Sequence, residues 1–430
     1  MNIGVLGLWH LGLVNAVGLS CAGHNVIGLC ENDTELKNLL NGLMPVFEPK
    51  LDELCKEVTN SKKLTFLLNQ NISYECLNVL LVAYDTPVNR QDQADTDYVM
   101  ERVKKAILNL QNNTTVVISS QLPVGSVRQL EDFTKKHLPK LNINFASVPE
   151  NLRLGDAFNV FLNPDRVVVG CRTDETKNIM RQMFAPITDN ILYVGTESAE
   201  MIKHSINSFL AMSVVFANEI AAVCEHVGAD GQEVAAGLKT DQRIGKKAYL
   251  SPGSAFSGGT LARDINYLNA ISREAKLGSK IFSAVRNGNS AHRLWVKKQI
   301  EKATQYIEKP HITIWGLTYK QGTDTLRRSE MVELVRWLSV KGLVPTVYEP
   351  NLTVLPSFLK KLVNHENNPM ASLKDKNILV IGNTNSLFHE LCSQIQLNNF
   401  VVIDPSGELE CKLAGECKVY IKVGKKVVRG

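Results

Sequence analysis

Residues 3–30, IGVLGLWHLGLVNAVGLSCAGHNVIGLC, decide the fold of this chain. A short apolar run at 3–8 leads into a glycine-containing turn, a helical pattern follows, and a second apolar run occupies 25–30. Strand, glycine turn, helix and strand in this order open a doubly wound α/β sheet. We therefore predict the α/β class, with the turn after the first strand as a ligand site.

The alternation of strand and helix patterns extends to about Asn190. A long helical stretch without Pro or Gly then runs from 197 to 227, with apolar residues at three- and four-residue spacing, and a second helical block runs from Asp264 to about Thr304. The pattern predicts two Rossmann-like doubly wound domains joined by a long central helix. Further strand candidates are 79–84, 115–120, 143–148, 166–170, 311–316, 345–350, 377–382 and 400–404, and an amphipathic helix is expected at 329–342.

Composition excludes several classes of protein. The 430 residues exceed what one core normally holds, so we expect three domains, at 1–195, 196–304 and 305–430. The net charge of +5 forms no basic stripe, so no nucleic-acid partner is expected. The nine cysteines show no CxxC or metal spacing, which predicts reduced thiols, no metal and a cytoplasmic protein. No signal peptide and no apolar run of about 20 residues is seen, so no membrane partner is expected.

The turn at 7–12 carries a partial dinucleotide-binding pattern. GxGxxG lets the backbone approach a pyrophosphate at a helix N-terminus, and here Gly7 and Gly12 fit while Trp9 stands at the middle glycine. An acidic residue near the end of the second strand normally binds the ribose. Glu31 lies there, and it is either that ribose ligand or a solvated residue at the start of a helix.

Several segments, in order along nearly the whole chain, carry a family resemblance. Pro252–Asp264 (PGSAFSGGTLARD) resembles the active-site loop PGxGFGGSCFPKD of the UDP-glucose/GDP-mannose dehydrogenase family. The other matching segments are 86–87 (TP), 123–126 (PVGS), 149–155 (PENLRLG), 203–207 (KHSIN), 240–245 (TDQRIG) and 316–329 (GLTYKQGTDTLRRS).

The resemblance implies an NAD-dependent oxidoreductase that acts on a CH–OH group of a UDP- or GDP-linked sugar and forms a homodimer. The three regions would then be an NAD-binding domain, a helical dimerisation domain with the active-site loop, and a nucleotide-sugar-binding domain. The catalytic residues implied are Lys203, Asn207, Asp264, Glu150 and Thr260. Those implied for the cofactor are Gly7, Trp9, Gly12, Glu31, Thr86, Pro87, Gln121, Arg263 and Arg327. Those implied for the substrate are Leu152, Arg153, Arg243, Tyr249, Phe256, Gly258 and Lys320.

Besides Trp9, five positions depart from the family pattern, and one of them is Ser406, which replaces the Arg that the resemblance places on the substrate. Cys30 stands at the usual ribose-binding Asp, and Thr260 falls where the family has its nucleophilic cysteine. Leu154 replaces a carboxylate and Gln121 replaces a threonine, both expected near the hydrolytic half of the reaction. A threonine hydroxyl is a far weaker nucleophile than a thiolate, so we expect oxidation without the covalent thioester step.

Two other functions stay open at this point. One is an NAD-retaining epimerase or dehydratase with transient oxidation, and the other is a non-catalytic protein that binds nucleotide sugars. Taken singly, Lys203 suits a solvated helix lysine, Asn207 a local cap, and Asp264 a helix N-cap. The oxidoreductase hypothesis rests on their joint occurrence, with Lys203 and Asn207 one helical turn apart.

Overall fold

The computed structural model describes residues 1–71, 74–87, 89, 94–149, 152–153, 155–257, 259–319, 324–326 and 328–427. The chain divides into two compact units, Met1–Ile206 and Asn207–Gly430, which we treat separately. The three domain boundaries expected from the sequence stay a prediction.

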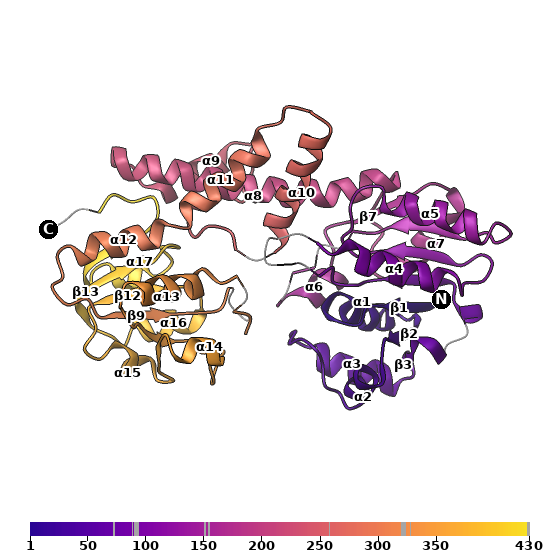
Figure 1. The fold of residues 1–430 in the computed structure, drawn as a ribbon, viewed down its shortest axis with the longest axis horizontal. Helices are drawn as coiled ribbons and strands as arrows, with labels where there is room; N and C mark the ends of the chain where they lie inside the picture. Colours follow the sequence, from indigo (N-terminus) through magenta and orange to yellow (C-terminus); the bar gives the residue numbers. More distant parts are fainter. Residues whose placement is uncertain are drawn as a thin grey trace. The chain divides into compact units, whose positions relative to one another are not determined.

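The first unit is built on an eight-stranded sheet of order β3-β2-β1-β4-β5-β6-β7-β8 (Figure 1). β1 pairs in parallel with both β2 and β4, so the strand order reverses at β1/β4, where ligands bind in doubly wound sheets. The strands are β1 (Asn2–Leu6), β2 (Asn25–Cys30), β3 (Leu64–Leu68), β4 (Val79–Val82), β5 (Thr115–Ile118), β6 (Asn144–Ser147), β7 (Val167–Cys171) and β8 (Ile191–Val194). The helices are α1 (His10–Cys21), α2 (Asp33–Leu40), α3 (Leu51–Asn60), α4 (Thr96–Ile107), α5 (Ser126–His137), α6 (Ala157–Leu162) and α7 (Asp174–Phe184), with short turns η1 (Asn69–Asn71) and η2 (Tyr74–Cys76).

One pairing in this sheet departs from a wholly parallel arrangement. β7 pairs antiparallel with β6, with Ala146 opposite Cys171, while β7 and β8 are parallel to each other. The last two strands therefore run opposite to the first six. The predicted α/β class is confirmed, with this reversal added.

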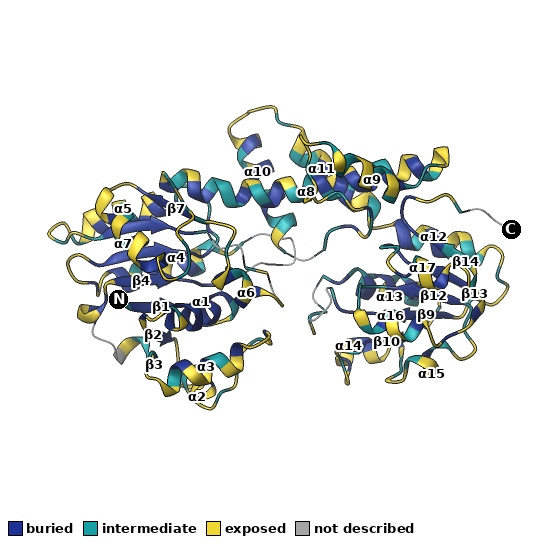
Figure 2. Cartoon of the chain, turned by 180° about the vertical axis from the view of Figure 1, so that it is seen from behind, coloured by how far each residue is buried: buried dark blue, intermediate teal, exposed yellow. Residues whose placement is uncertain are grey.

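The second unit contains the rest of the long helix and a six-stranded sheet of order β11-β10-β9-β12-β13-β14, in which every pairing is parallel. Figure 2 shows buried strands in both sheets and exposed outer faces on the helices that cover them. The strands are β9 (Ile312–Trp315), β10 (Thr346–Tyr348), β11 (Asn364–His365), β12 (Ile378–Ile381), β13 (Leu397–Ile403) and β14 (Cys417–Ile421). The helices are α8 (Thr196–Val227, which starts in the first unit), α9 (Gly231–Thr240), α10 (Thr260–Glu274), α11 (Ile281–His292), α12 (Trp295–Thr304), α13 (Glu330–Val340), α14 (Ser357–Lys360), α15 (Pro369–Leu373), α16 (Ser386–Cys392) and α17 (Glu410–Leu413).

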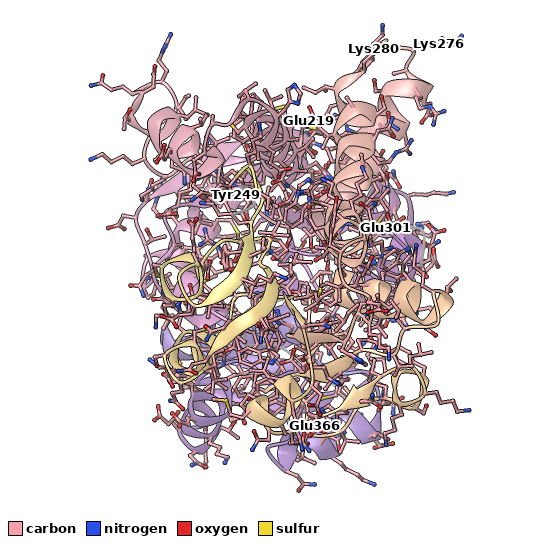
Figure 3. The ribbon with its side chains drawn as sticks, turned by 90° about the vertical axis from the view of Figure 1, so that its left-hand side faces the viewer. Glu219, Tyr249, Lys276, Lys280, Glu301 and Glu366 are labelled. Carbon is pink, nitrogen blue, oxygen red and sulfur yellow. The ribbon has the colours of Figure 1, made fainter. Side chains whose placement is uncertain are left out.

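The second helical block expected from the sequence consists of three helices, α10, α11 and α12. Lys276 and Gly278 adopt φ values of 52° and 66° in the turn between α10 and α11, and this left-handed backbone ends the helix (Figure 3). α8 is continuous, as predicted, and it is the one helix in the described part of the chain long and apolar enough to cross a membrane. It is the central helix of this fold.

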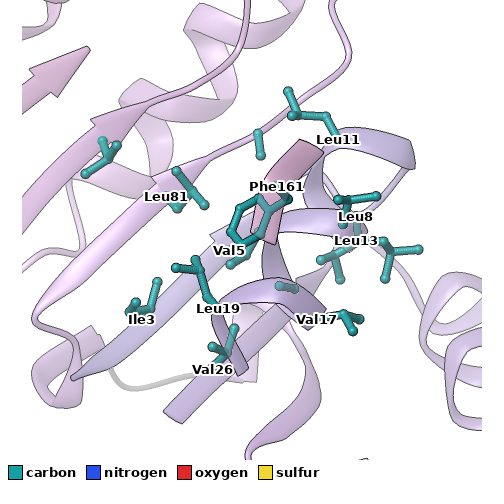
Figure 4. Close-up of a cluster of buried hydrophobic side chains, with 14 of the residues drawn as sticks. Ile3, Val5, Leu8, Leu11, Leu13, Val17, Leu19, Val26, Leu81 and Phe161 are labelled. Carbon is teal, nitrogen blue, oxygen red and sulfur yellow. The ribbon is translucent and has the colours of Figure 1, made fainter. Parts of the chain in front are cut away.

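The core of the first unit fixes the position of the turn after β1. Apolar side chains of β1, α1, β2 and α6 form one buried cluster, which includes Ile3, Val5 and Leu13 (Figure 4). A Cβ at Gly18 would lie 2.4 Å from the ring of Phe161, so α1 and α6 are in close contact there. Helix α1 is thereby held against the sheet with its N-terminus at the carboxyl end of β1.

Candidate active site

The turn after β1 has the geometry of a dinucleotide-binding turn. Gly7 adopts a φ of 87°, and a Cβ there would lie 2.6 Å from the backbone nitrogen of Tyr84. A Cβ on Gly12 would lie 2.0 Å from the carbonyl oxygen of Gly7. Neither position accepts a larger residue, and the start of α1 lies against the turn so that its amides can face an anion. The residues of the turn therefore fit the pyrophosphate of a dinucleotide.

A carboxylate already lies at the N-terminus of α1. Trp9 is the N-cap residue, its side chain is 52% exposed, and it makes no side-chain cap hydrogen bond. The backbone nitrogen of Leu11 instead donates to the carboxylate of Asp85 at 3.2 Å. The sequence analysis did not single out Asp85. Its place just beyond a buried strand, beside Thr86, is the signal that could have found it.

Glu31 is held by neighbouring side chains. The hydroxyl of Tyr84 donates to one carboxylate oxygen of Glu31 at 2.5 Å, and Nε of Arg102 lies 3.3 Å from the other. The Arg102 guanidinium also lies over the ring of Tyr98, 3.6 Å from its centroid. Cys30 is fully buried, which raises the pKa of its thiol to about 12. Glu31 therefore belongs to a partly exposed cluster with Tyr84 and Arg102, which is a third possibility beside a ribose ligand and a solvated residue at a helix start.

The other cofactor candidates of the first unit lie at the ends of β4 and β5. The buried hydroxyl of Thr86 donates to the backbone oxygen of Gln121 at 2.8 Å, which joins the two strand ends. Pro87, the next residue, is exposed. Both strand ends lie at the carboxyl edge of the sheet, the edge at which α/β folds bind ligands.

A small cavity of about 20 Å³ lies at this edge, with room for roughly one water molecule. Lys203 of α8 lines it, together with Gln121. Glu200, one turn earlier, accepts hydrogen bonds from the backbone nitrogens of Gly125 and Val127, and burial raises the pKa of its carboxyl. The full lining is Ile118, Ser119, Ser120, Gln121, Leu122, Ser147, Pro149, Glu200, Lys203 and His204.

In the second unit, α8 and α10 bring two of the predicted catalytic residues together. The side-chain amide of Asn207 donates to the carboxylate of Asp264 at 2.5 Å, and Asp264 is fully buried. Nε of Arg263 lies 3.5 Å from the other carboxylate oxygen. Thr260 is the first residue of α10, is exposed, and precedes Asp264 by one helical turn. A buried, hydrogen-bonded carboxylate of this kind can hold a water molecule or accept a proton.

The segment 252–257 before α10 is fixed by three side chains, of which Asn218 belongs to a segment that also matches the family pattern, while Asn289 and His292 were not predicted. Asn218 of α8 accepts from the backbone nitrogen of Gly253 at 2.9 Å. Asn289 of α11 accepts from the nitrogen of Phe256 at 2.9 Å and donates to its oxygen at 3.0 Å. His292 contacts the oxygen of Gly253 at 2.7 Å, and burial lowers the pKa of its imidazole. The 252–257 part of the predicted active-site loop is therefore held by hydrogen bonds within the second unit.

The structure describes four further predicted substrate residues. Leu152 packs against the core of the first unit, and Arg153 is exposed. Arg243 is exposed and pairs with Asp241 at 2.7 Å, and the side chain of Tyr249 is 61% exposed (Figure 3). Six positions interpreted above lie outside the described residues, namely Glu150, Asn151, Leu154, Gly258, Lys320 and Arg327.

A second, much smaller pocket, without room for a water molecule, lies at the carboxyl ends of β12 and β13. Asn383 and Asn385 line it with His389 and Ser406. The buried carboxylate of Asp404 accepts from the hydroxyl of Ser406 at 2.7 Å and from several backbone nitrogens, which fixes the loop after β13. The strand order of this sheet reverses between β9 and β12, which is the usual nucleotide position in such sheets, and Asn383 after β12 donates to the hydroxyl of Thr318 after β9 at 3.0 Å.

Comparison with known sequences gives matches that follow one another along the chain. The NAD binding domain of the UDP-glucose/GDP-mannose dehydrogenase family matches residues 1–188, the central domain matches 197–291, and the UDP binding domain matches 313–409. The chain belongs to this family.

Individual members of the family agree with this assignment. The chain is 34% identical over 354 residues to UDP-glucose 6-dehydrogenase of Rickettsia bellii, covering 81% of each chain. It is 31% identical over 403 residues to that of Rickettsia prowazekii, covering 91% of each. A UDP-glucose dehydrogenase structure from the archaeon Pyrobaculum islandicum superposes with a TM-score of 0.88 at 26% identity, covering 99% of this chain and 98% of the other.

Membership establishes the general activity. The protein is an NAD-dependent oxidoreductase of the nucleotide-sugar dehydrogenase family, and Met1–Ile206 includes its NAD-binding domain. The match to the family's UDP binding domain spans most of the second sheet, up to and including β13, and contains the pocket beside β12, so a nucleotide sugar is the substrate class.

Proposed function

We propose that this protein oxidises a CH–OH group of a UDP- or GDP-linked sugar, in the manner of UDP-glucose 6-dehydrogenases, without a covalent thioester step. The observation that carries the proposal is the buried carboxylate of Asp264, bonded to Asn207 and one helical turn after Thr260. A proton acceptor is thereby kept in place one helical turn after the position where the family has a thiol and this chain has a hydroxyl.

In the proposed reaction, the substrate hydroxyl gives up its proton and its carbon gives up a hydride. Bound NAD would supply the hydride acceptor. Asp264 would receive the proton through a water molecule, because its carboxylate is buried and oriented by Asn207. Lys203 and Asn207, one turn apart on α8, would stabilise the negative charge that develops on the oxygen. Glu150 would assist as a further acid near the sugar, as the resemblance implies.

Thr260 limits the proposed reaction to two electrons. A second oxidation through a thioester needs a nucleophile that is ionised near neutral pH, and a cysteine thiol with a pKa near 8.5 meets that need. A hydroxyl without a strong base does not, even at the N-terminus of α10. The expected product is therefore an aldehyde or its hydrate.

The substrate and cofactor contacts proposed for the remaining residues follow the resemblance. Arg153, Arg243, Tyr249, Phe256 and Lys320 would contact the nucleotide sugar, together with Leu152 and Gly258. Thr86, Pro87, Gln121, Arg263 and Arg327 would border the cofactor, with Gly7, Trp9, Gly12 and Glu31.

We also propose a homodimer and a cytoplasmic location. Phe209, Phe216 and Val223 of α8 are exposed by 61%, 47% and 57%, at a spacing of seven residues that places them on one side of the helix. An exposed apolar stripe of this kind is typical of an interface with another copy. Light scattering after size exclusion should give a dimer mass, and Phe216→Lys should shift it toward the monomer.

The test of the reaction is incubation with NAD and a panel of UDP- and GDP-sugars, followed by NADH quantification and mass spectrometry of the products. We expect one NADH per converted sugar and no uronic acid. Two NADH per sugar with a uronic acid would contradict the assignment of Thr260, and a product isomeric with its substrate would indicate transient oxidation.

Two substitutions of Thr260 distinguish a site that lacks only a nucleophile from a site that is inactive for other reasons. Thr260→Cys should gain uronate formation if Lys203, Asn207 and Asp264 are competent. Thr260→Ser, which removes the methyl group but adds no thiol, serves as the control and should gain none.

A further inference from the structure

We propose that Asp85 competes with the cofactor pyrophosphate for the N-terminus of α1, so that this residue sets the affinity of the protein for NAD(H). The inference rests on the proposed function only in that NAD(H) is the dinucleotide bound. It concerns a contact within the first unit that the reaction itself does not require.

The first step of the argument is the position of the carboxylate. The backbone nitrogen of Leu11, in the first turn of α1, donates to Asp85 at 3.2 Å. That amide belongs to the group of unpaired donors at a helix N-terminus to which a pyrophosphate binds in a Rossmann fold. The carboxylate and the pyrophosphate therefore require the same donors and the same positive end of the helix dipole.

The second step is the reason that a carboxylate is needed there in the free protein. Trp9, at the N-cap, has no acceptor and makes no cap hydrogen bond. Since Ser, Thr, Asn or Asp at the N-cap would normally satisfy the first-turn amides, Asp85 supplies that function from the segment after β4. Gly7 brings the two segments together, because it packs against the backbone of Tyr84.

The third step concerns Tyr84, the residue before Asp85, which contacts the acid expected to bind the ribose. Tyr84 donates its hydroxyl to Glu31, the acid at the end of β2, which Arg102 also contacts. Tyr84 and Asp85 therefore hold, side by side, the acid expected near the ribose and the amides expected near the pyrophosphate. A dinucleotide in the usual position would need the Leu11 amide that Asp85 now occupies.

The charges add to this competition. Glu48 is buried and lies 2.8 Å from Nε2 of His10, at the first position of α1. Bringing a pyrophosphate to a helix start that already faces Asp85 adds like charges at short range. The N-terminus of a helix favours one anion, and in the free protein Asp85 is that anion. Removing the charge of Asp85 should therefore raise the affinity for NAD(H) about tenfold.

The experiment is calorimetric titration of the full chain with NADH and with ADP-ribose, using wild type and Asp85→Asn. The amide keeps an acceptor for the Leu11 nitrogen but loses the charge, and Asp85→Ser offers a smaller neutral acceptor if the first variant does not fold. The matched control is Asp95→Asn, because Asp95 caps α4 by accepting from the nitrogen of Tyr98 at 3.1 Å.

We expect about tenfold tighter binding of both ligands to the Asp85 variants. Adenosine, which lacks a pyrophosphate, should bind equally to all proteins, and Asp95→Asn should match wild type. Unchanged or weaker NADH binding in both Asp85 variants would overturn the inference, as would an equal gain in Asp95→Asn or no binding by any protein. A gain in affinity without sugar oxidation would support the inference while contradicting the proposed reaction.

Discussion

Gly12→Ala tests the claim that close contact between the glycine turn and α1 creates the cofactor site. The added Cβ would lie 2.0 Å from the oxygen of Gly7 and 2.7 Å from its carbonyl carbon. Real Cβ atoms essentially never approach within 3.0 Å, so helix and turn must separate by about 1 Å. Since the clash is with backbone, we place its cost near the upper end of the usual range for overpacking, about 3 kcal/mol.

The higher helix propensity of alanine offsets about 1 kcal/mol of that cost, which leaves a net loss of about 2 kcal/mol. For a unit of this size the melting temperature should fall by about 4–8 °C. NADH affinity should fall as well, because the amides of α1 move away from the turn. Thermal denaturation followed by circular dichroism and calorimetric NADH titration measure the two effects.

The control for this prediction is the same substitution in an uncrowded helix. A Cβ on Gly237, inside α9, would meet nothing within 4 Å, so Gly237→Ala should leave the melting temperature unchanged or raise it. If Gly12→Ala melted at the wild-type temperature and bound NADH equally well, the turn would not have the packing described above.

Two further predictions concern the second unit. Burial raises the pKa of the Glu330 carboxyl from 4.5 to about 7, although Nε of Arg293 lies 3.3 Å away. Because the folded protein holds this proton more tightly than the unfolded chain, the stability that Glu330 contributes is complete below pH 4.5 and is lost as pH rises through 7. Urea denaturation should show the free energy of unfolding falling by about 3 kcal/mol over that range, and Glu330→Gln should remove this slope. Asn289→Ala leaves two backbone groups of Phe256 unpaired and should cost about 1–3 kcal/mol and lower kcat, whereas the exposed Asn287→Ala should change neither.

The sequence predicted the elements whose signals are local. Apolar runs located β4, β5 and β12 to within about two residues, because buried parallel strands are continuously hydrophobic. The three- and four-residue spacing of apolar residues predicted the long helix α8, and the glycines at 7 and 12 predicted the turn after β1. These features depend on neighbours in the chain, so they can be read without a structure.

Features that depend on distant partners could not be predicted in this way. The apolar run of β7 does not encode that it lies antiparallel to β6. The two-residue strand β11 is stabilised by its pairing with β10 rather than by its own sequence. The role of Asp85 depends on Leu11, which is 74 positions away in the chain. The proposed catalytic residues were named from family resemblance, and their contacts became visible only in the fold.

The reversal of β7 and β8 has a consequence for how Lys203 reaches the carboxyl edge of the sheet. β8 ends at the edge opposite the end of β5, and α8 begins two residues later and returns across the sheet. The seven helical steps from Thr196 to Lys203 advance about 10 Å, which is close to the length of a four-residue strand.

The length of this stretch of α8 thus determines where Lys203 lies. The rotation of the helix about its axis is fixed by the next residue, His204, whose Nε2 lies 3.0 Å from the oxygen of Leu122. One inserted residue between Gly195 and Glu200 would turn the helix by about 100° and point the lysine away from its cavity. The count of residues in this segment is therefore constrained independently of their identities.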